Sequence, residues 1–515
     1  MRHILLTITM LLSLPISSQT LQWGDQGDGT YINPILPSDY SDPDVIRVGG
    51  RYYMVASDFH YVGMQILVSD DLVNWSVLTH IYDGFHEAGW DTNSHYAKGS
   101  WAPSIRYHNG MFYVFFCSPE TGLYMTKAAK AAGPWSPLLK VVDVKGWEDP
   151  CPFWDDDGKA YLGHSLHGAG PIIVHRMSDD GTQILDTGKV VYRGPVAEGT
   201  KFYKRDGIYY LFIPEGGVGE GWQTALRADN IYGPYERRIV MSQGSTVING
   251  PHQGALVETP EGELWFIHYQ LTIPLGRVVH LQPARWIDGW PVTGRDIDGD
   301  GVGEPVYRWR KPDTRTQTTA HIETDDDFTT ASLKPIWQWN HDPEMGMVET
   351  GDSLLTLHAM AATTLKDARN TLTQKLIGYE GHITVSLDTH GMADGQRAGL
   401  AAIGRQNHEM GVMRDNGQLY AYEAVDGKIT WRQPMTAATL TLMMDSYTKS
   451  NIFIMGYDDS QTVHHTAPFA MEMGHWKGVR CALFSYNTLS AGGKASFSHF
   501  KYDVVRKRER QKKIS

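Results

Sequence analysis

Five segments in the first 290 residues of this 515-residue chain repeat one sequence pattern: a polar or aromatic residue, an apolar stretch, a glycine turn, and a second stretch rich in Tyr, Phe or Trp. Turn pairs such as Asn109-Gly110 and Asp206-Gly207 are strong signals for tight β-hairpins, because these turns need positive φ. The turn glycines, separated by 60, 48, 49 and 55 residues, are Gly50, Gly110, Gly158, Gly207 and Gly262. An all-β period of roughly 50 residues is typical of one propeller blade, so the pattern predicts a five-bladed β-propeller.

The residue that opens each repeat is the best candidate for chemistry. It lies eight to ten residues before the turn glycine, and equivalent positions in a propeller surround one end of the central channel. The five opening residues are Asp42, Trp101, Asp149, Glu198 and His252. Gathering three carboxylic acids is costly, because like charges repel and burial disfavours the ionised form. Each acid alone is typical of a turn, but their shared repeat position favours a site.

Three carboxylic acids in one ring fit the chemistry of glycoside hydrolysis. That reaction needs a protonated acid for the leaving oxygen and a second carboxylate on the other face of the sugar. A third carboxylate can keep the acid protonated near neutrality by raising its pKa. In the same ring, Trp101 offers a stacking surface and His252 a hydrogen-bonding or ligand position.

The repeat segment resembles glycoside hydrolase family 43, the five-bladed propeller enzymes that include β-xylosidases and α-L-arabinofuranosidases. The resemblance extends from about Asn33 to about Gly294. It rests on the motifs Asn33-Pro34-Ile35-Leu36, Ser41-Asp42-Pro43-Asp44, Trp101-Ala102-Pro103-Ser104, Glu148-Asp149-Pro150, Ala197-Glu198-Gly199, His252-Gln253-Gly254 and Asp288-Gly289-Trp290-Pro291. Members of this family invert the anomeric centre.

The resemblance implies a role for each acid. It implies that Asp42 is the general base that activates water and that Glu198 is the general acid. Asp149 is implied to orient the acid and to raise its pKa. The expected activity is exo-hydrolysis that releases terminal β-D-xylose or α-L-arabinofuranose from hemicellulose oligosaccharides. An endo-arabinanase and a sugar-binding propeller without catalysis are the alternatives, and the sequence does not choose between the two pentoses.

Four further residues are implied to line the substrate site. Phe59 looks like the aromatic wall of the −1 subsite and Trp101 like its partner. Arg277 looks like the arginine that holds a sugar hydroxyl. His252 matches a channel histidine that holds a water or a structural calcium in several relatives. No cofactor is expected to be required for the reaction.

A second candidate calcium position is the loop Asp296-Ile297-Asp298-Gly299-Asp300-Gly301, whose acidic spacing resembles the start of a calcium-binding loop. The twelfth position is Tyr307 instead of Glu and no flanking helices are evident, which excludes an EF-hand. A plain acidic, glycine-rich turn is the favoured interpretation of Asp296, Asp298 and Asp300, with a bound calcium as the alternative.

The blade pattern ends near Pro305, so residues 30–305 are the predicted propeller domain and residues 306–324 a polar linker. Alternating stretches such as 382–387 then predict a β-sandwich over residues 325–505. Motifs at 337–341 and 485–488 look like the concanavalin-like sandwich at the C-terminus of many family 43 xylosidases, where it packs on the propeller and helps to close the pocket. A carbohydrate-binding module is the competing interpretation.

The two ends of the chain carry different signals. Residues 1–19 combine Arg2 and His3 with a short apolar run and small residues, the layout of a secretory signal peptide. The run is too short for a membrane span, and no Cys follows it, so we expect a secreted or periplasmic protein without a membrane anchor. Residues 506–515 form a basic tail, interpreted as a solvated end.

Charge and cysteine content narrow the classes of partner. A net charge of −12 argues against nucleic acid, and the expected partners are xylo- or arabino-oligosaccharides. The three cysteines, Cys117, Cys151 and Cys481, are too few and scattered for a disulfide framework or a zinc site and are expected to be packed inside. The sequence leaves the oligomeric state open.

Overall fold

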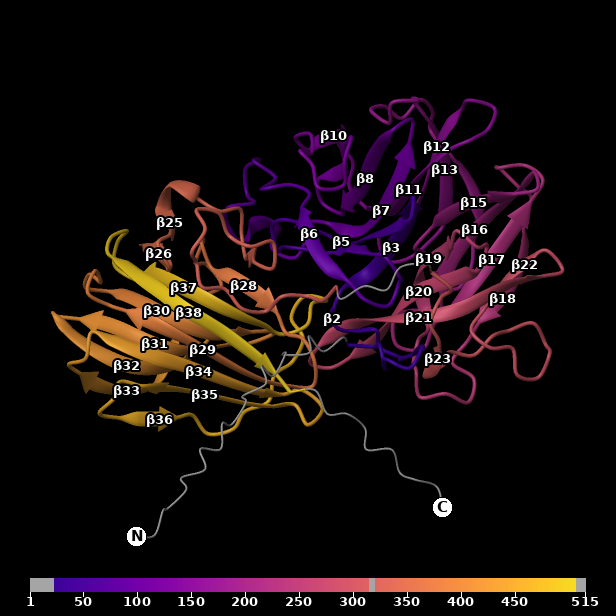
Figure 1. The fold of residues 1–515 in the computed structure, drawn as a ribbon. Coiled ribbons are helices and arrows are strands. Elements are labelled where there is room, and N and C mark those ends of the chain that lie inside the picture. Colours follow the sequence, from indigo (N-terminus) through magenta and orange to yellow (C-terminus); the bar gives the residue numbers. More distant parts are fainter. Residues whose placement is uncertain (1–22, 315–319, 506–515) are drawn as a thin grey trace, which may run out of the picture.

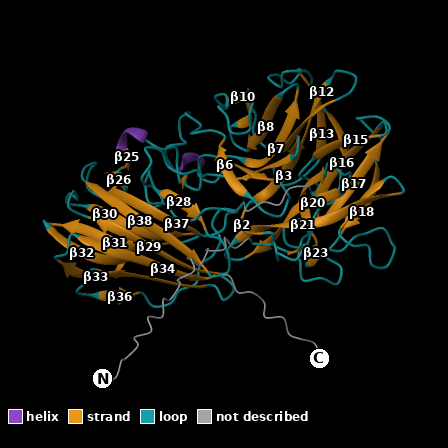
Figure 2. Cartoon of the chain, in the orientation of Figure 1, coloured by secondary structure: helices purple, strands orange, loops and turns teal. Residues whose placement is uncertain are grey.

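The computed structural model describes residues 23–314 and 320–505. The predicted signal peptide, part of the predicted linker and the basic tail lie outside these residues. The regular secondary structure of the described chain is almost entirely β-strand, with two short 3-10 helices, η1 (Asn93–His95) and η2 (Met345–Met347) (Figure 2). None of the helices in this part of the chain is long and apolar enough to cross a membrane.

Five antiparallel sheets form the N-terminal half, as the repeat predicts (Figure 1). Blade 1 comprises β3 (Ser41–Val48), β4 (Arg51–Ser57), β5 (Gln65–Ser69) and β6 (Ser76–His80). Blade 2 comprises β7 (Trp101–His108), β8 (Met111–Ser118), β9 (Gly122–Ala128) and β10 (Leu139–Val142). Blade 3 comprises β11 (Trp147–Trp154), β12 (Ala160–Leu166), β13 (Ile172–Met177) and β14 (Lys189–Tyr192). Blades 4 and 5 comprise β15 (Lys201–Arg205), β16 (Ile208–Glu215), β17 (Trp222–Ala228) and β18 (Glu236–Met241); and β19 (His252–Glu258), β20 (Leu264–Thr272), β21 (Gly276–Ile287) and β22 (Trp290–Thr293), with β2 (Leu36–Asp39) added to β21. Each blade contacts the next, and β19 returns to β3, which closes the ring.

The hairpin turns explain why the repeat is visible in the sequence. Both residues of Asn109-Gly110 and of Asp206-Gly207 have positive φ, between 48° and 81°. Such turns match the right-handed twist of the strands that they join. In blades 2 and 4 the first two strands are therefore paired by local turn chemistry.

The ring is closed by the start of the chain, because β2 pairs with β21 of blade 5. Asn33 holds this junction from within the core: its amide nitrogen donates to the carbonyls of Leu281 and Val306, both at 2.8 Å, and its oxygen accepts from the Leu281 N–H. These three hydrogen bonds explain why an Asn side chain suits this position of the Asn33-Pro34-Ile35-Leu36 motif.

The segment expected to be a linker is not wholly free of structure. Within it, β23 (Arg308–Arg310) pairs with β1 (Thr30–Ile32) at the propeller edge. Lys311 adds ion pairs to Asp25 at 2.6 Å and Asp71 at 2.8 Å. The start of residues 306–324 is thus anchored on the propeller, which its polar composition did not indicate.

The C-terminal half is a two-sheet sandwich. One sheet contains β24 (Gln338–Trp339), β27 (Met360–Ala361), β28 (Leu372–Lys375), β30 (Gln396–Ile403), β31 (Asn407–Asp415), β32 (Gln418–Val425), β33 (Lys428–Met435) and β37 (Arg480–Asn487). The other contains β25 (Val348–Gly351), β26 (Leu354–His358), β29 (Glu380–Asp388), β34 (Thr439–Tyr447), β35 (Ile452–Asp458), β36 (Val463–His465) and β38 (Lys494–Val504). The alternating burial along β29 shows why its sequence predicts a strand with one face in the core.

Sandwich and propeller lie side by side with β2 near their junction (Figure 1). One continuous apolar core joins blades 1, 2 and 5 to the sandwich, where it includes Trp337 and Trp339. The backbone of Trp339 also accepts a hydrogen bond from the Val62 N–H at 2.8 Å. The three cysteines are buried free thiols, as expected.

Candidate active site

The predicted ring of opening residues is one position out of register in three blades. Positive φ occurs at one backbone position in or just before the inner strand of each blade, namely at Asp42, Ala102, Asp149, Gly199 and Gln253. In four blades the register with the next strand also shifts there, which marks a β-bulge. Trp101, Glu198 and His252 therefore precede the position that Asp42 and Asp149 occupy. With the corrected alignment the turn glycine follows after eight or nine residues in every blade, a signal that was present in the sequence.

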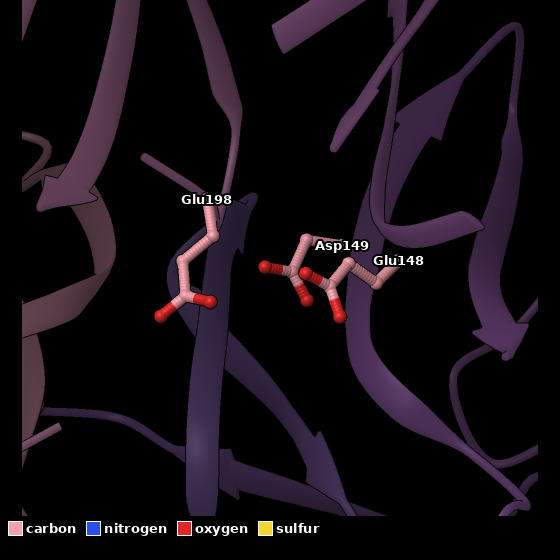
Figure 3. A group of neighbouring side chains, drawn as sticks. All are labelled: Glu148, Asp149 and Glu198. Atoms are coloured by element: carbon pink, nitrogen blue, oxygen red, sulfur yellow. The ribbon is translucent and has the colours of Figure 1, made fainter. Parts of the chain in front are cut away.

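The bulge explains how neighbouring residues can serve one site. An ordinary strand sends successive side chains to opposite faces, whereas a bulge re-aims one of them. Glu148 and Asp149 are consecutive on β11, and their carboxylate oxygens lie within 4.8 Å of each other and of Glu198. Figure 3 shows Glu148 and Asp149 side by side, with Glu198 opposite them.

Asp42 is buried at the start of β3, and both of its carboxylate oxygens are held. The Ser57 hydroxyl donates to one oxygen at 2.6 Å, and the Arg277 guanidinium donates to the other at 2.6 Å. The Arg277 side chain also lies over the Tyr269 ring at 4.9 Å. The arginine predicted to hold a sugar hydroxyl is thus an ion-pair partner of the predicted base.

Asp149 is buried, and its carboxylate accepts a 2.6 Å hydrogen bond from the Gly199 N–H. Because Gly199 follows Glu198, this bond ties blade 3 to the loop that carries the predicted acid. Burial, and then the charge of Asp42, raise the pKa of Asp149 above its usual range.

Glu198 lies before β15 and remains partly exposed. Burial raises its pKa well above that of an ordinary Glu, and the charges of Asp149 and Asp42 raise it further. A carboxyl group in these surroundings stays protonated at neutral pH, which is the state that a general acid requires.

Glu148 is a fourth carboxyl group at the site, and sequence reasoning missed its importance. It is buried, accepts a hydrogen bond from the Ala169 N–H at 3.1 Å, and has a raised pKa because of burial and the charges of Asp149 and Glu198. The available signal was the corrected blade alignment, in which Glu148 is equivalent to Glu198. The turn-glycine spacing alone did not reveal it.

The two predicted wall residues do meet. The rings of Phe59 and Trp101 are in edge-to-face contact with centroids 5.1 Å apart. Phe59 has a φ of 55°, and two backbone hydrogen bonds of 3.1 Å join it to Ser100, next to Trp101. The wall is therefore built from two blades that a backbone bridge holds together.

His252 is buried in blade 5, where Nδ1 is 2.7 Å from the Gly250 carbonyl. Burial lowers the pKa of His252 to about 4, so the imidazole is neutral. Because Nδ1–H donates to the Gly250 carbonyl, Nε2 presents a lone pair, and Nε2 has no hydrogen-bond partner among the described residues. These features suit a hydrogen-bond acceptor or a ligand position.

The acidic loop lies apart from His252. Asp296, Asp298 and Asp300 bring carboxylate oxygens within 4.8 Å of one another, and His252 is not in this group. Asp296 accepts hydrogen bonds from the N–H groups of Gly299 and Gly301 at 2.7 and 3.2 Å. Such local bonds are those of an acidic glycine-rich turn, and calcium binding stays a prediction.

The sandwich contributes residues that sequence reasoning did not assign to the site. In the segment before β37, Trp476 lies with its ring 5.7 Å from the Arg277 guanidinium and is 54% exposed. The neighbouring His475 contacts the ring of Tyr96, from the loop before blade 2, with centroids 5.1 Å apart. No local pattern distinguishes this segment, because its role depends on how the two halves pack.

Carboxylic acids gathered within a propeller that also carries an aromatic pair are the arrangement expected of a glycoside hydrolase. The sequence matches the family described as glycosyl hydrolases family 43 over residues 31–291. It also matches the beta xylosidase C-terminal concanavalin A-like domain over residues 325–503. The chain belongs to glycoside hydrolase family 43, which confirms the family and fold predicted from its motifs.

Relatives extend the similarity over nearly the whole chain. A protein of Xylanibacter ruminicola named putative beta-xylosidase is 54% identical over 471 residues, or 90% of this chain and 88% of that protein. A beta-xylosidase of Formosa agariphila is 34% identical and covers 94% of this chain and 92% of its own length. The crystal structure of the GH43 BlXynB protein from Bacillus licheniformis has a TM-score of 0.81 at 26% identity and covers 92% of this chain and 100% of that one.

Proposed function

We propose that this protein is an inverting exo-glycosidase that removes terminal pentose residues from xylo- and arabino-oligosaccharides. The observation that carries the proposal is the pairing of two unlike carboxyl groups at one channel end. Asp42 is held on both oxygens by Ser57 and Arg277, whereas Glu198 has a pKa raised by burial and by the charges of Asp149 and Asp42. A fixed carboxylate and a protonated acid are the two groups that inverting hydrolysis needs.

In the proposed reaction, Asp42 takes a proton from a water molecule whose oxygen attacks the anomeric carbon. The bond from that carbon to the leaving oxygen breaks, and Glu198 gives its proton to the leaving oxygen. Asp149 keeps Glu198 protonated and holds its loop through the Gly199 N–H. Phe59 and Trp101 form the wall on which the sugar ring packs.

Exo action is supported by the position of the sandwich. Trp476 lies against Arg277, which itself binds Asp42, so the sandwich reaches the rim of the site. A rim built from two domains favours a pocket for a chain end over an open groove. This arrangement weighs against an endo-arabinanase.

Xylose is the proposed first substrate and arabinofuranose the second. Of the relatives that match nearly the whole chain, one is named putative beta-xylosidase and another beta-xylosidase. A relative of Bacteroides ovatus, 27% identical over 76% of this chain, is named a non-reducing end alpha-L-arabinofuranosidase. The two sugars present similar hydroxyl groups, which makes a shared pocket chemically reasonable.

Hydrolysis of p-nitrophenyl β-xyloside and α-L-arabinofuranoside tests the proposal. We expect turnover by the wild type, with the inverted anomer seen first by NMR, and loss of turnover in Asp42→Asn. Glu198→Gln should lose more activity on xylobiose than on the aryl xyloside, because an activated leaving group needs less protonation. Absence of turnover would indicate a sugar-binding propeller without catalysis. A retained anomer would exclude the role of Asp42 as the base that activates water. Long products from linear arabinan would indicate endo action.

We also propose that the protein is exported to the periplasm or the medium, on the basis of the residues 1–19 pattern. N-terminal sequencing of protein from the native host should show cleavage near residue 19. Calcium content of the dialysed protein, compared with an Asp296→Asn and Asp298→Asn double variant, tests the loop prediction.

A further inference from the structure

Lys477 is a charged residue of the sandwich that lies fully buried against the propeller. Its ammonium group donates to the Ser57 carbonyl at 2.8 Å and forms an ion pair with Asp39 at 2.8 Å. Asp58 lies at 4.0 Å, and the ring of Phe59 is 5.7 Å away. All four of these partners belong to the propeller, so one sandwich side chain gathers several segments beside the site.

Two partners of Lys477 connect it to the Asp42 carboxylate by hydrogen bonds and an ion pair. Ser57, whose carbonyl binds Lys477, uses its hydroxyl to hold one carboxylate oxygen of Asp42. Asp39, the ion-pair partner of Lys477, accepts the backbone N–H of Arg277 at 2.9 Å, and Arg277 holds the other oxygen. One support of the Asp42 carboxylate, Ser57, thus binds Lys477 directly, and the other, Arg277, is connected to Lys477 through Asp39.

The segment that carries Lys477 is itself fixed on the propeller. The Gly478 N–H donates to Asp39 at 3.0 Å, and the Val479 N–H donates to the Pro274 carbonyl at 3.0 Å. A Cβ on Gly478 would lie 1.9 Å from the Leu275 carbonyl oxygen, so the two backbones touch. The ammonium position is therefore set by the docking of the sandwich.

We propose that Lys477 is a positioning residue through which the sandwich orients the Asp42 carboxylate for attack by water. The inference rests on the proposed function of Asp42 as the general base. Among the described residues Lys477 forms no hydrogen bond or ion pair with Asp42, and it acts by holding Ser57 and Asp39. A displacement of a reacting group by about 1 Å can lower the reaction rate roughly a hundredfold.

The main test compares Lys477→Met with Lys375→Met in the full chain. Lys375 is a matched control, because it is a second sandwich lysine buried at the same junction, with a side chain 6% exposed against 1% for Lys477. Lys375 binds Asp58, Gln65 and Gln338, and within residues 23–314 and 320–505 it forms no hydrogen bond or ion pair with Ser57 or Asp39. We expect Lys477→Met to lower kcat roughly 10- to 100-fold with KM nearly unchanged, and Lys375→Met to keep kcat.

Two further readouts separate positioning from a general structural defect. The loss in Lys477→Met should be similar on aryl xyloside and on xylobiose, unlike that of the acid variant Glu198→Gln. The effect of Lys477→Met on kcat should also disappear in the Asp42→Asn background. The Asp42→Asn variant and the Asp42→Asn, Lys477→Met double variant should then have the same residual activity, because both substitutions remove the function of the Asp42 carboxylate. An unchanged kcat, a loss confined to KM, or the same loss in the Asp42→Asn background overturns the inference.

Asp39→Asn keeps the test decisive if Lys477→Met does not fold. This variant weakens the same ion pair from the propeller side with little change in shape, and we expect the same kcat loss and the same disappearance in Asp42→Asn. A folded Asp39→Asn with normal kcat overturns the inference. A wild type inactive on pentosides, or a fully active Asp42→Asn, counts against the proposed function itself.

Discussion

The aspartates at this site have the same side chain but different surroundings. Asp42 and Asp149 occupy equivalent backbone positions in two blades, with φ of 54° and 56°. The first has a guanidinium and a hydroxyl as partners, and the second has one backbone N–H and two other acids nearby. The proposed roles of acid, base and modulator are based on such differences in environment.

At this scale the first prediction concerns Asp149. Its charge helps to raise the pKa of Glu198, so activity that requires protonated Glu198 persists at neutral pH and is lost as pH rises through that raised pKa. Asp149→Asn removes the charge and should move the alkaline limb of the kcat/KM profile down by roughly one pH unit. An alkaline limb that does not move would contradict the role assigned to Asp149.

The second prediction concerns Glu148, whose raised pKa implies a neutral side chain at pH 7. Glu148→Gln should then keep kcat/KM on the aryl xyloside near the wild-type value at neutral pH, because the amide imitates a protonated carboxyl group. Glu148→Ala should have a lower kcat/KM than Glu148→Gln, since it leaves the Ala169 N–H without its acceptor. Equal losses in both variants would show that Glu148 works as an anion.

Strands and bridges set where these residues point. The bulge in β11 brings two consecutive acids to one site, and the backbone bridge between Phe59 and Ser100 joins the two halves of the aromatic wall. Both features are irregularities in an otherwise regular sheet pattern. Bulges of this kind are also where the repeat can be misaligned by one residue.

At the element scale, Gly99→Ala tests the bridge. A Cβ at Gly99 would lie 1.8 Å from the Phe59 carbonyl oxygen, so the bridge must open and the wall must move. We expect a clear loss of kcat/KM, measured on the aryl xyloside. Gly50→Ala, where an added Cβ meets nothing within 4 Å, is the matched control and should behave as wild type. Normal activity in Gly99→Ala would show that the wall tolerates displacement.

The two halves of the molecule share one core and one buried charge network. Asp58, next to Phe59, forms ion pairs with Lys375 at 3.0 Å and Arg480 at 3.3 Å. Burial alone would raise the pKa of Asp58, but Lys375, Lys477 and Arg480 lower it to about 2. The sandwich is therefore tied to the propeller by a buried charge network as well as by the shared core.

At the scale of the whole molecule, Asp58→Asn should destabilise the protein by about 3–5 kcal/mol, because it leaves buried cations uncompensated. Urea unfolding measures the change, and Asp83→Asn, at a side chain 92% exposed, should have no effect. Since the pKa of Asp58 is lowered on folding, its contribution is present at neutral pH and is lost as pH falls from about 4 towards 2. Equal stability of wild type and Asp58→Asn at neutral pH would contradict the role of the network.

The repeat, the five blades, the sandwich and the residues Asp42, Asp149 and Glu198 could all be predicted from local patterns. Turn pairs such as Asn109-Gly110 encode their own hairpins, because positive φ is a property of the residues themselves. The meeting of Phe59 with Trp101 followed from the family resemblance. The blade alignment was wrong by one residue in three blades, because a bulge changes the count without leaving a distinct residue type.

The amino-acid sequence by itself determined the blades, the acids they carry and the family, since hairpin turns and strand alternation act over a few neighbouring residues. Tertiary structure alone decided which acids keep their protons, because the pKa of Glu198 depends on burial and on charges from other blades. It also decided that Arg277 holds Asp42 and that Lys477, 420 residues from Ser57, supports the same group. Contacts at such separations depend on packing of whole domains, for which no local sequence signal exists.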